Sequence, residues 1–263
     1  MKVQNKVVVV TGAGSGMGRQ LTLELISRGA LVAAIDLRAE TLAETKKLAG
    51  GKVETFTVDI TDAKAVAALP AQVTKKLGAP DILINNAGII QPFVKINDLT
   101  LEKAVRVMNV NFEGPLMMIK AFLPGFLTRP EAHILNVSSM GAYAPVPGQS
   151  VYGASKAAIK LLTEGLRSEL TDTNVGVTIV FPGAINTNIA QNSGMAMPGD
   201  AAADSKIKMT EAPVAAHQMI EAIENNRPRI CIGSDAKMLD VISRINPVFA
   251  AKLIYKQMAS LLK

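Results

Sequence analysis

A tyrosine and a lysine four residues apart, Tyr152 and Lys156, are the pair in this chain best suited to acid–base chemistry. Residues at this spacing share one face of a helix, so the lysine ammonium can lie beside the tyrosine phenol. A free phenol has a pKa of about 10, and a nearby cation lowers that pKa toward the range in which a general acid or base works well. Ser139 precedes the tyrosine by thirteen residues. Because such pairs also arise by chance in helices, their meaning depends on the elements that position them.

A phosphate-binding turn is predicted near the N-terminus. The β-branched run Lys6–Val10 (KVVVV) is typical of a strand inside a parallel sheet, and TGAGSGMG and a helical pattern follow it. Strand, glycine-rich turn and helix in this order bring backbone N–H groups up to a phosphate. The common GxGxxG fingerprint is not matched, because Met17 stands where the third glycine belongs. The glycines instead fit TGxxxGxG, with Gly12, Gly16 and Gly18 as its members.

The next predicted strand, residues 31–36, ends in Asp36, twenty residues after Gly16. A carboxylate at this place accepts hydrogen bonds from an adenosine ribose and repels a 2′-phosphate. It would also serve as a helix N-cap, because a helical stretch follows at residues 40–48. Arg38 could reach a 2′-phosphate or extend into solvent. The pattern therefore favours NAD over NADP without deciding between them.

From Lys6 to about Thr187, the chain is similar to the short-chain dehydrogenases/reductases, NAD(P)-dependent oxidoreductases of about 250 residues. Six motifs in family order carry the resemblance: VDITD with Asp59, Asn85–Gly88 (NNAG), NVNFEG with Asn111, NVSS with Ser139, the Tyr152/Lys156 pair, and residues 182–187 (PGAINT).

The resemblance implies a catalytic set of Asn111, Ser139, Tyr152 and Lys156. Tyr152 would give a proton to a carbonyl oxygen or take one from an alcohol, while Ser139 holds the reacting oxygen. Lys156 would lower the tyrosine pKa and bind the nicotinamide ribose. Asn111 would hold a water that links the lysine to solvent. The interval to Tyr152 selects Ser139 over the adjacent Ser138, which keeps a backbone role near the nicotinamide.

The same resemblance implies the residues that bind the cofactor. Asp59 would lie near the adenine. Thr187 would bond the nicotinamide carboxamide, or else cap the helix that follows it. The predicted set is Gly12, Ser15, Gly16, Met17, Gly18, Asp36, Asp59, Ile60, Asn86, Ala87, Gly88, Tyr152, Lys156, Pro182, Gly183, Ile185 and Thr187.

The alternation of strand-like and helical segments predicts an α/β fold in a single domain over residues 1–263. Its sheet would be Rossmann-like, doubly wound and parallel, with seven strands. At 263 residues and 49% hydrophobic content, the chain can bury a substantial core. Helical patterns fall between most of the strands, as in sheets covered on both faces. The expected strands are 6–11, 31–36, 53–58, 81–85, 133–138, 175–181 and 229–233.

No metal site, internal disulfide, signal peptide or membrane span is predicted. Cys231 is the single cysteine, and the two histidines, His133 and His217, are far apart in sequence. The first strand begins at once, and no apolar run approaches the ~20 residues that span a bilayer. The net charge of +6 is dispersed, without the basic and aromatic patch typical of nucleic-acid binding. A cytoplasmic location is expected.

Residues 188–210 depart from the family pattern and are predicted to form a substrate lid, because they are rich in small residues and loop formers. Met195 and Met197 would supply an adaptable apolar wall, or else anchor the lid on the core. This composition favours a bulky or apolar alcohol over a sugar.

Residues 236–263 form a predicted helical extension that also diverges from the family. Its last helix carries Lys252, Lys256 and Lys263 on one side and Ala250, Ile254, Met258 and Leu261 on the other. Such a helix would pack on its own or a partner subunit, or would make peripheral contact with a membrane surface.

These features predict an oxidoreductase that transfers a hydride between a nicotinamide cofactor, NAD favoured, and a secondary alcohol or ketone. An NADPH-dependent ketone or β-ketoacyl reductase is the alternative among enzymes. A non-catalytic NAD(P)-binding regulator is the alternative from another class, and the complete catalytic set speaks against it. A homodimer or homotetramer is expected, because the helix at about 101–127 and the one that carries Tyr152 pair across a two-fold axis in many relatives.

Overall fold

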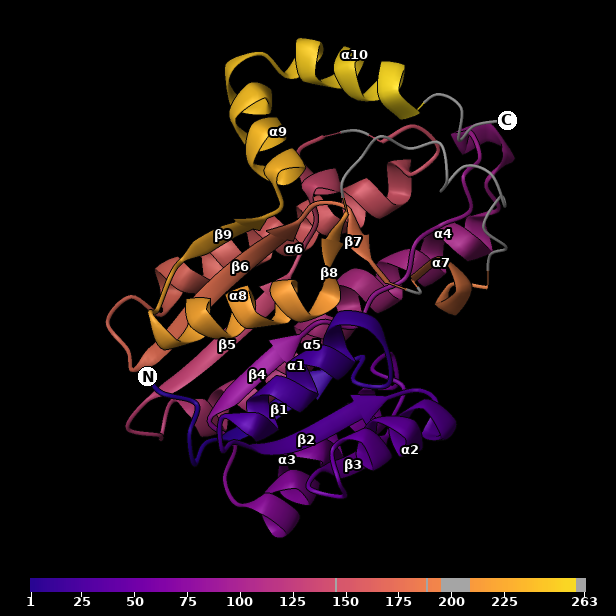
Figure 1. The fold of residues 1–263 in the computed structure, drawn as a ribbon. Coiled ribbons are helices and arrows are strands. Elements are labelled where there is room, and N and C mark those ends of the chain that lie inside the picture. Colours follow the sequence, from indigo (N-terminus) through magenta and orange to yellow (C-terminus); the bar gives the residue numbers. More distant parts are fainter. Residues whose placement is uncertain (145, 188, 195–208, 259–263) are drawn as a thin grey trace.

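The computed structural model describes residues 1–144, 146–187, 189–194 and 209–258. Seven parallel strands form one sheet in the order β3-β2-β1-β4-β5-β6-β9 (Figure 1). The strands are β1 (Val7–Thr11), β2 (Leu31–Asp36), β3 (Glu54–Thr57), β4 (Ile82–Asn85), β5 (Ala132–Val137), β6 (Val175–Pro182) and β9 (Arg229–Ile232). The predicted doubly wound α/β sheet in a single domain is confirmed, and the strands begin and end within one residue of their predicted bounds.

The strands are apolar on both faces because helices cover both faces of the sheet. In β1, Val8 and Val10 face one buried core, while Val7 and Val9 face the other. Helices α1 (Gly16–Ser27), α2 (Ala39–Leu48) and α8 (Ala212–Glu224) cover the first core; α3 (Ala63–Leu77), α5 (Gly114–Phe126) and α6 (Ser150–Glu169) cover the second.

The helix expected at about 101–127 contains a π-helical turn. α4 (Leu101–Met108) runs into the π-helical turn η2 (Asn109–Glu113), which continues into α5. Asn111 lies in this turn and is buried. π-helical turns are rare and frequently occur at functional sites, which is consistent with the role that the resemblance implies for this residue.

The sheet reverses its winding at β1, which lies between β2 and β4. Ligands of doubly wound sheets bind outside the carboxyl ends of the strands at this reversal. The glycine-rich turn follows β1, Asp36 ends β2, and Asn86 follows β4. The sheet order therefore brings residues from three distant parts of the sequence to one crevice.

Short elements gather beyond the carboxyl ends of the strands: the 3₁₀ turns η1 (Ile96–Asp98) and η3 (Met140–Ala142), α7 (Ile189–Asn192), and the paired strands β7 (Ile185–Asn186) and β8 (Thr210–Glu211). Most of the predicted lid, including Met195 and Met197, lies outside the described residues. The function of the lid thus stays a prediction.

The C-terminal extension is a pair of helices, α9 (Ser234–Ile245) and α10 (Pro247–Met258), at the periphery of the molecule (Figure 1). Ala250 and Ile254 are buried, so the predicted apolar side of the last helix packs on its own chain. Leu261 and Lys263 lie outside the described residues. Among the described helices, none is long and apolar enough to span a membrane.

Candidate active site

The turn between β1 and α1 has a backbone that only glycine readily adopts. Gly12 and Gly16 have φ angles of +67° and +50°, in the left-handed region. A Cβ atom added to Gly18 would lie 2.0 Å from the carbonyl oxygen of Gly12. Gly14 N donates a hydrogen bond to Asp36 Oδ2 at 2.9 Å, which ties the turn to the end of β2. The three glycines of TGxxxGxG therefore each meet a structural demand.

A pocket of about 320 Å³ opens beside this turn. Predicted cofactor residues that line it are Gly12, Ser15, Gly16, Met17, Asp36, Asp59, Ile60, Asn86, Ala87, Gly88 and Thr187. Predicted residues absent from its lining are Gly18, Tyr152, Lys156, Pro182, Gly183 and Ile185. Arg106 and Asn192 also line the pocket, although sequence analysis did not single them out.

The ends of β1 and β4 are joined at the floor of this pocket. Thr11 Oγ1 accepts hydrogen bonds from the backbone N–H groups of Asn86 and Ala87, each at 3.0 Å. Asn86 Nδ2 donates to the Thr11 carbonyl oxygen, also at 3.0 Å. Asn86 Oδ1 is buried and has no hydrogen-bond partner among the described residues. A buried acceptor left unpaired beside a pocket indicates a place for a polar ligand.

Arg38 and Asn192 close one side of the pocket. Arg38 Nη2 donates to Asn192 Oδ1 at 2.8 Å, and Asn192 Nδ2 donates to Ser15 Oγ at 2.8 Å. The N-cap residue of α2 is Arg38, so the alternative role of Asp36 as that N-cap is wrong. The Asp36 carboxylate instead accepts the backbone N–H groups of Gly14 and Arg38 and faces the pocket.

Tyr152, Lys156 and Ser139 converge at the carboxyl edge of the sheet. Tyr152 and Lys156 lie one turn apart on α6, with Lys156 Nζ 5.8 Å from the centre of the tyrosine ring. A Cβ atom added to Gly141 would lie 3.4 Å from Tyr152 Cε1 and 3.5 Å from Ser139 Oγ, so both side chains border the same point. Ser138 is directed elsewhere, because its hydroxyl donates to the Lys156 carbonyl oxygen at 2.7 Å.

Burial controls the protonation of this pair. It raises the pKa of Tyr152 above its ordinary value, and a hydrogen bond with Ser139 acts in the opposite direction. Burial also lowers the pKa of Lys156 to about 8. The net shift of the tyrosine pKa is therefore upward in the protein alone, because the cost of burying a phenolate is the larger effect, and a lowering of that pKa by Lys156 stays a prediction. Lys156 Nζ donates a hydrogen bond to the Val137 carbonyl oxygen at 3.0 Å.

The Asn111 side chain holds three parts of the site together. Its Oδ1 accepts from Ile89 N at 2.9 Å, and its Nδ2 donates to Ile89 O at 2.9 Å and to Ser155 Oγ at 3.0 Å. A Cβ atom added to Gly88 would lie 3.2 Å from both Asn111 Oδ1 and Lys156 Nζ. Asn111 therefore lies beside the lysine, and its expected role in holding a water stays a prediction.

Gln91, which sequence analysis missed, anchors the start of α6. This fully buried side chain accepts hydrogen bonds at Oε1 from the N–H groups of Val151 (2.8 Å) and Tyr152 (3.0 Å). Its Nε2 donates to the Gly148 carbonyl oxygen at 2.8 Å. The N-cap residue itself, Gln149, makes no side-chain cap hydrogen bond. Gln91 therefore caps the helix from the loop after β4, a tertiary contact that no local motif marks.

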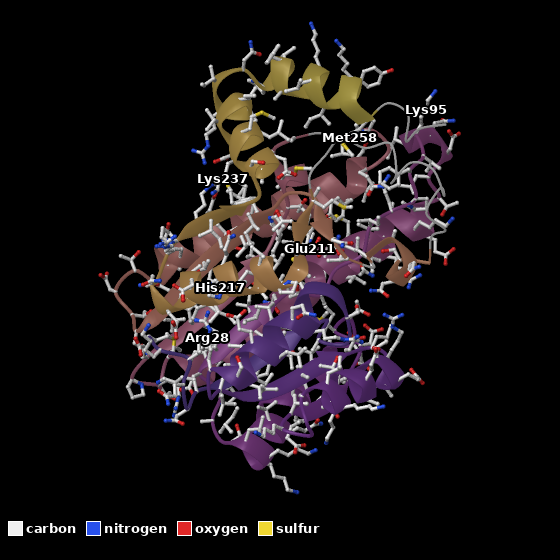
Figure 2. All side chains as sticks on the ribbon, in the orientation of Figure 1. Arg28, Lys95, Glu211, His217, Lys237 and Met258 are labelled. Carbon is white, nitrogen blue, oxygen red and sulfur yellow. The ribbon has the colours of Figure 1, made fainter. Side chains whose placement is uncertain are left out.

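Elsewhere in the part of the chain that the structure describes, titratable groups form no second candidate centre of this kind. Within the described residues, no group of three or more His, Cys, Asp or Glu side chains could hold a metal ion. His133 is buried in β5, where its Nε2 lies 2.8 Å from Thr178 Oγ1. Figure 2 shows His217 on α8, on the outside of the molecule near Arg28.

The chain belongs to the short-chain dehydrogenase family, whose model matches residues 6–197. It is 34% identical over 252 residues to the oxidoreductase SadH of Mycobacterium tuberculosis, an alignment that covers 92% of this chain and 91% of SadH. It is also 36% identical over 200 residues to mouse dehydrogenase/reductase SDR family member 7B, over 73% of this chain and 61% of that protein. The protein is therefore an oxidoreductase of this family.

Solved structures of the family share the whole architecture. A short-chain dehydrogenase/reductase from Burkholderia phymatum, in complex with NAD, superposes with a TM-score of 0.83 at 26% identity over 93% of both chains. A short-chain dehydrogenase from Burkholderia cenocepacia, in complex with NADP, gives 0.80 at 28% identity over 100% of both chains. Because these two structures hold different cofactors, they support the same fold without deciding between NAD and NADP.

Proposed function

We propose that this protein is an NAD-dependent oxidoreductase that interconverts secondary alcohols and ketones, with Tyr152 as the acid–base group. The observation that carries the proposal is the convergence of Tyr152, Ser139 and Lys156 beside a pocket whose wall includes Asp36. The pocket would hold the cofactor, and the three side chains would act on the substrate oxygen.

The pocket residues fit a nicotinamide dinucleotide. The glycine-rich turn at the N-terminus of α1 leaves room for a pyrophosphate beside backbone N–H groups, as Gly12 and Gly16 carry no side chain. Asp36 would accept hydrogen bonds from the adenosine ribose, and the unpaired Asn86 Oδ1 offers another acceptor. When bound, the nicotinamide supplies the hydride-transfer chemistry.

Asp36 is the basis for preferring NAD. A 2′-phosphate beside its carboxylate would meet like charge. Arg38 is the residue that would favour NADP, and its guanidinium is bound to Asn192. An NADPH-dependent ketone or β-ketoacyl reductase remains the second candidate, favoured by the position of Arg38 in the pocket wall. That function requires Arg38 to exchange Asn192 for a phosphate.

The protonation states suit proton transfer in both directions. With its pKa raised by burial, Tyr152 is a phenol at neutral pH and can donate a proton to a carbonyl oxygen. Lys156, with a pKa of about 8, is mostly cationic at neutral pH. The positive charge of an oxidised nicotinamide would add to that of Lys156 and favour the phenolate needed to deprotonate an alcohol. Ser139 would hold the substrate oxygen within proton-transfer distance.

Apolar side chains beside Ser139 favour a bulky or apolar substrate. Met140 directly follows the serine, Tyr143 lies four residues after it, and both pack with Leu239 and Ile254 of the C-terminal helices. The homodimer or homotetramer expected from the resemblance stays a prediction.

Replacement of Tyr152 by phenylalanine tests the proposal. We expect NADH binding to be retained and turnover of secondary alcohols or ketones to fall by about 10² to 10⁴, the usual contribution of a general acid or base. Tyr143→Phe is the matched control, because that hydroxyl donates to the Ala236 carbonyl oxygen on α9 and takes no proposed part in proton transfer. Near-normal turnover by Tyr152→Phe would refute the assignment.

A further inference from the structure

The corner where α9 meets α10 exposes an apolar tip. The six consecutive residues 244–249 are all exposed. Three of them are large and apolar: Ile245 is 79% exposed, Val248 63% and Phe249 53%. Figure 1 shows α9 and α10 projecting beyond the carboxyl ends of the strands, at the edge of the molecule. Contiguous exposed apolar side chains do not stabilise a fold and instead mark an interaction surface.

The exposed charges of α9 and α10 have one sign. The exposed ionised side chains of the two helices are Lys237, Arg244, Lys252 and Lys256. The two carboxylates are engaged with the body of the protein: Asp235 accepts from Ala184 N at 2.7 Å, and Asp240 pairs with Arg229 at 2.5 Å. Arg244 also pairs with Asp240 but remains 61% exposed. From residue 241 to the end of the chain there is no Asp or Glu.

Both helices mix apolar and cationic residues on their outer faces. On α9 these residues are Lys237, Met238, Val241, Arg244 and Ile245; on α10 they are Val248, Phe249, Lys252, Tyr255 and Lys256. The spacing i, i+1, i+4, i+7, i+8 places each set on one face of its helix. The inner faces are already used, because Leu239 and Ile254 pack in a shared buried cluster. A cationic face with apolar residues and a tyrosine is typical of helices at a membrane interface.

We propose that the corner between α9 and α10 docks on an anionic membrane surface. Ile245, Val248 and Phe249 enter the headgroup region, and the surrounding lysines and Arg244 contact anionic lipids. An anionic lipid surface complements this charge and attracts basic segments near it. Docking depends on this corner and on the cations of its two helices, and not on the proposed reaction.

A second copy of the chain fits the corner less well. An isologous contact would place this patch against its own copy, and like charges would meet because the exposed ionised side chains of the two helices are all cations. A stable protein interface also takes about 20 to 30 residues a side, far more than this corner offers.

The docking also has a consequence for substrate access, which rests on the proposed function. It would hold the segment after Ser139, packed under the same helices, close to a source of apolar substrates.

Vesicle sedimentation tests the docking with the full chain. We expect the protein to sediment with vesicles of phosphatidylglycerol and phosphatidylcholine, and much less with phosphatidylcholine alone or in high salt. The variant Ile245→Ser/Val248→Ser/Phe249→Ser should bind the anionic vesicles at least about tenfold more weakly. Lys252→Gln/Lys256→Gln should bind about thirtyfold more weakly.

A matched control replaces apolar residues that are similarly exposed elsewhere. These are Leu48, Ile96 and Val214, at 57%, 61% and 48% exposure. Their triple serine variant should sediment like the parent, and thermal unfolding should confirm that each variant is folded. Equal sedimentation of the parent and the tip variant would overturn the proposal. The proposal would also be overturned if the parent protein did not sediment with anionic vesicles. It would be overturned as well if the only change in the tip variant were a lower molar mass by light scattering, which would indicate a contact between copies of the chain. Tyr152→Phe should sediment normally, which separates this test from that of the reaction.

Discussion

Replacing Gln91 by leucine should loosen the start of α6 and displace Tyr152. The glutamine is fully buried and is not part of the cofactor pocket lining. Its carboxamide makes the bonds to Val151 N, Tyr152 N and Gly148 O described above. Leucine approximates its volume but can make none of these bonds, so the helix would lose its cap while the packing stays nearly filled.

The expected magnitude follows from the groups left behind. Loss of an N-cap costs about 1 kcal/mol, and each buried polar group without a partner costs about 1 to 3 kcal/mol. We expect Gln91→Leu to lower the free energy of unfolding by about 3 kcal/mol, because some of the three groups will find water. A displacement of Tyr152 by about 1 Å would lower kcat about 100-fold. The affinity for NADH should change little.

Urea unfolding followed by circular dichroism measures the stability, and steady-state turnover of a secondary alcohol measures kcat. Gln149→Leu is the matched control, since it removes one hydrogen bond to the Gln91 carbonyl oxygen (2.7 Å) and no cap. That change should cost only about 1 kcal/mol.

Gln91→Glu adds a pH readout. A protonated glutamate reproduces every bond of the glutamine, so its kcat relative to the parent should rise as the pH falls. A Gln91→Leu protein with parental stability and kcat would refute this reasoning.

Further predictions concern stability and cofactor binding. Burial, aided by the positive N-terminus and Arg167, lowers the pKa of His133 from 6.5 to about 3. As the pH falls, the His133 imidazole therefore takes up a proton in the unfolded chain before it does so in the folded protein. The free energy of unfolding should fall between pH 6.5 and pH 3, by up to about 1.4 kcal/mol per pH unit. His133→Gln should flatten that part of the urea-unfolding profile, and an unchanged slope would contradict the assignment. Gly18→Ala should abolish NADH binding, because its Cβ would lie 2.0 Å from the Gly12 carbonyl oxygen. Gly165→Ala, with open space around it in α6, should instead stabilise the protein by about 0.5 to 1 kcal/mol in thermal unfolding. The packing argument would be refuted if Gly18→Ala still bound NADH, or if Gly165→Ala lowered the stability of the protein.

The sheet and much of the candidate site could be predicted from the sequence because their signals are local. Buried parallel strands are continuous apolar runs such as VVVV at the start of β1, and turns carry glycines where the backbone demands them. Family motifs then place residues such as Asp36 and Asn86 at strand ends. The order of the strands in the sheet is then enough to bring these residues together in one crevice.

The rest depends on tertiary contacts and burial, which no motif encodes. Gln91 caps a helix that begins more than fifty residues later in the chain. The bond between Arg38 and Asn192 links α2 to α7. The upward direction of the Tyr152 pKa shift follows from burial of the phenol, whereas its spacing from Lys156 suggested a downward shift. Likewise, Val248 and Phe249 resemble core residues in sequence, and only the packing of α10 exposes them.

Titration with NADH and, separately, NADPH tests the central claim most directly. The reduced nicotinamide's own fluorescence is the signal, because the chain has no tryptophan to transfer energy to it. We expect tighter binding of NADH than of NADPH, and a smaller difference in Asp36→Ala, where the carboxylate that would repel a 2′-phosphate is gone. Preference for NADPH would contradict the role of Asp36, and binding of neither cofactor would contradict the proposed function itself.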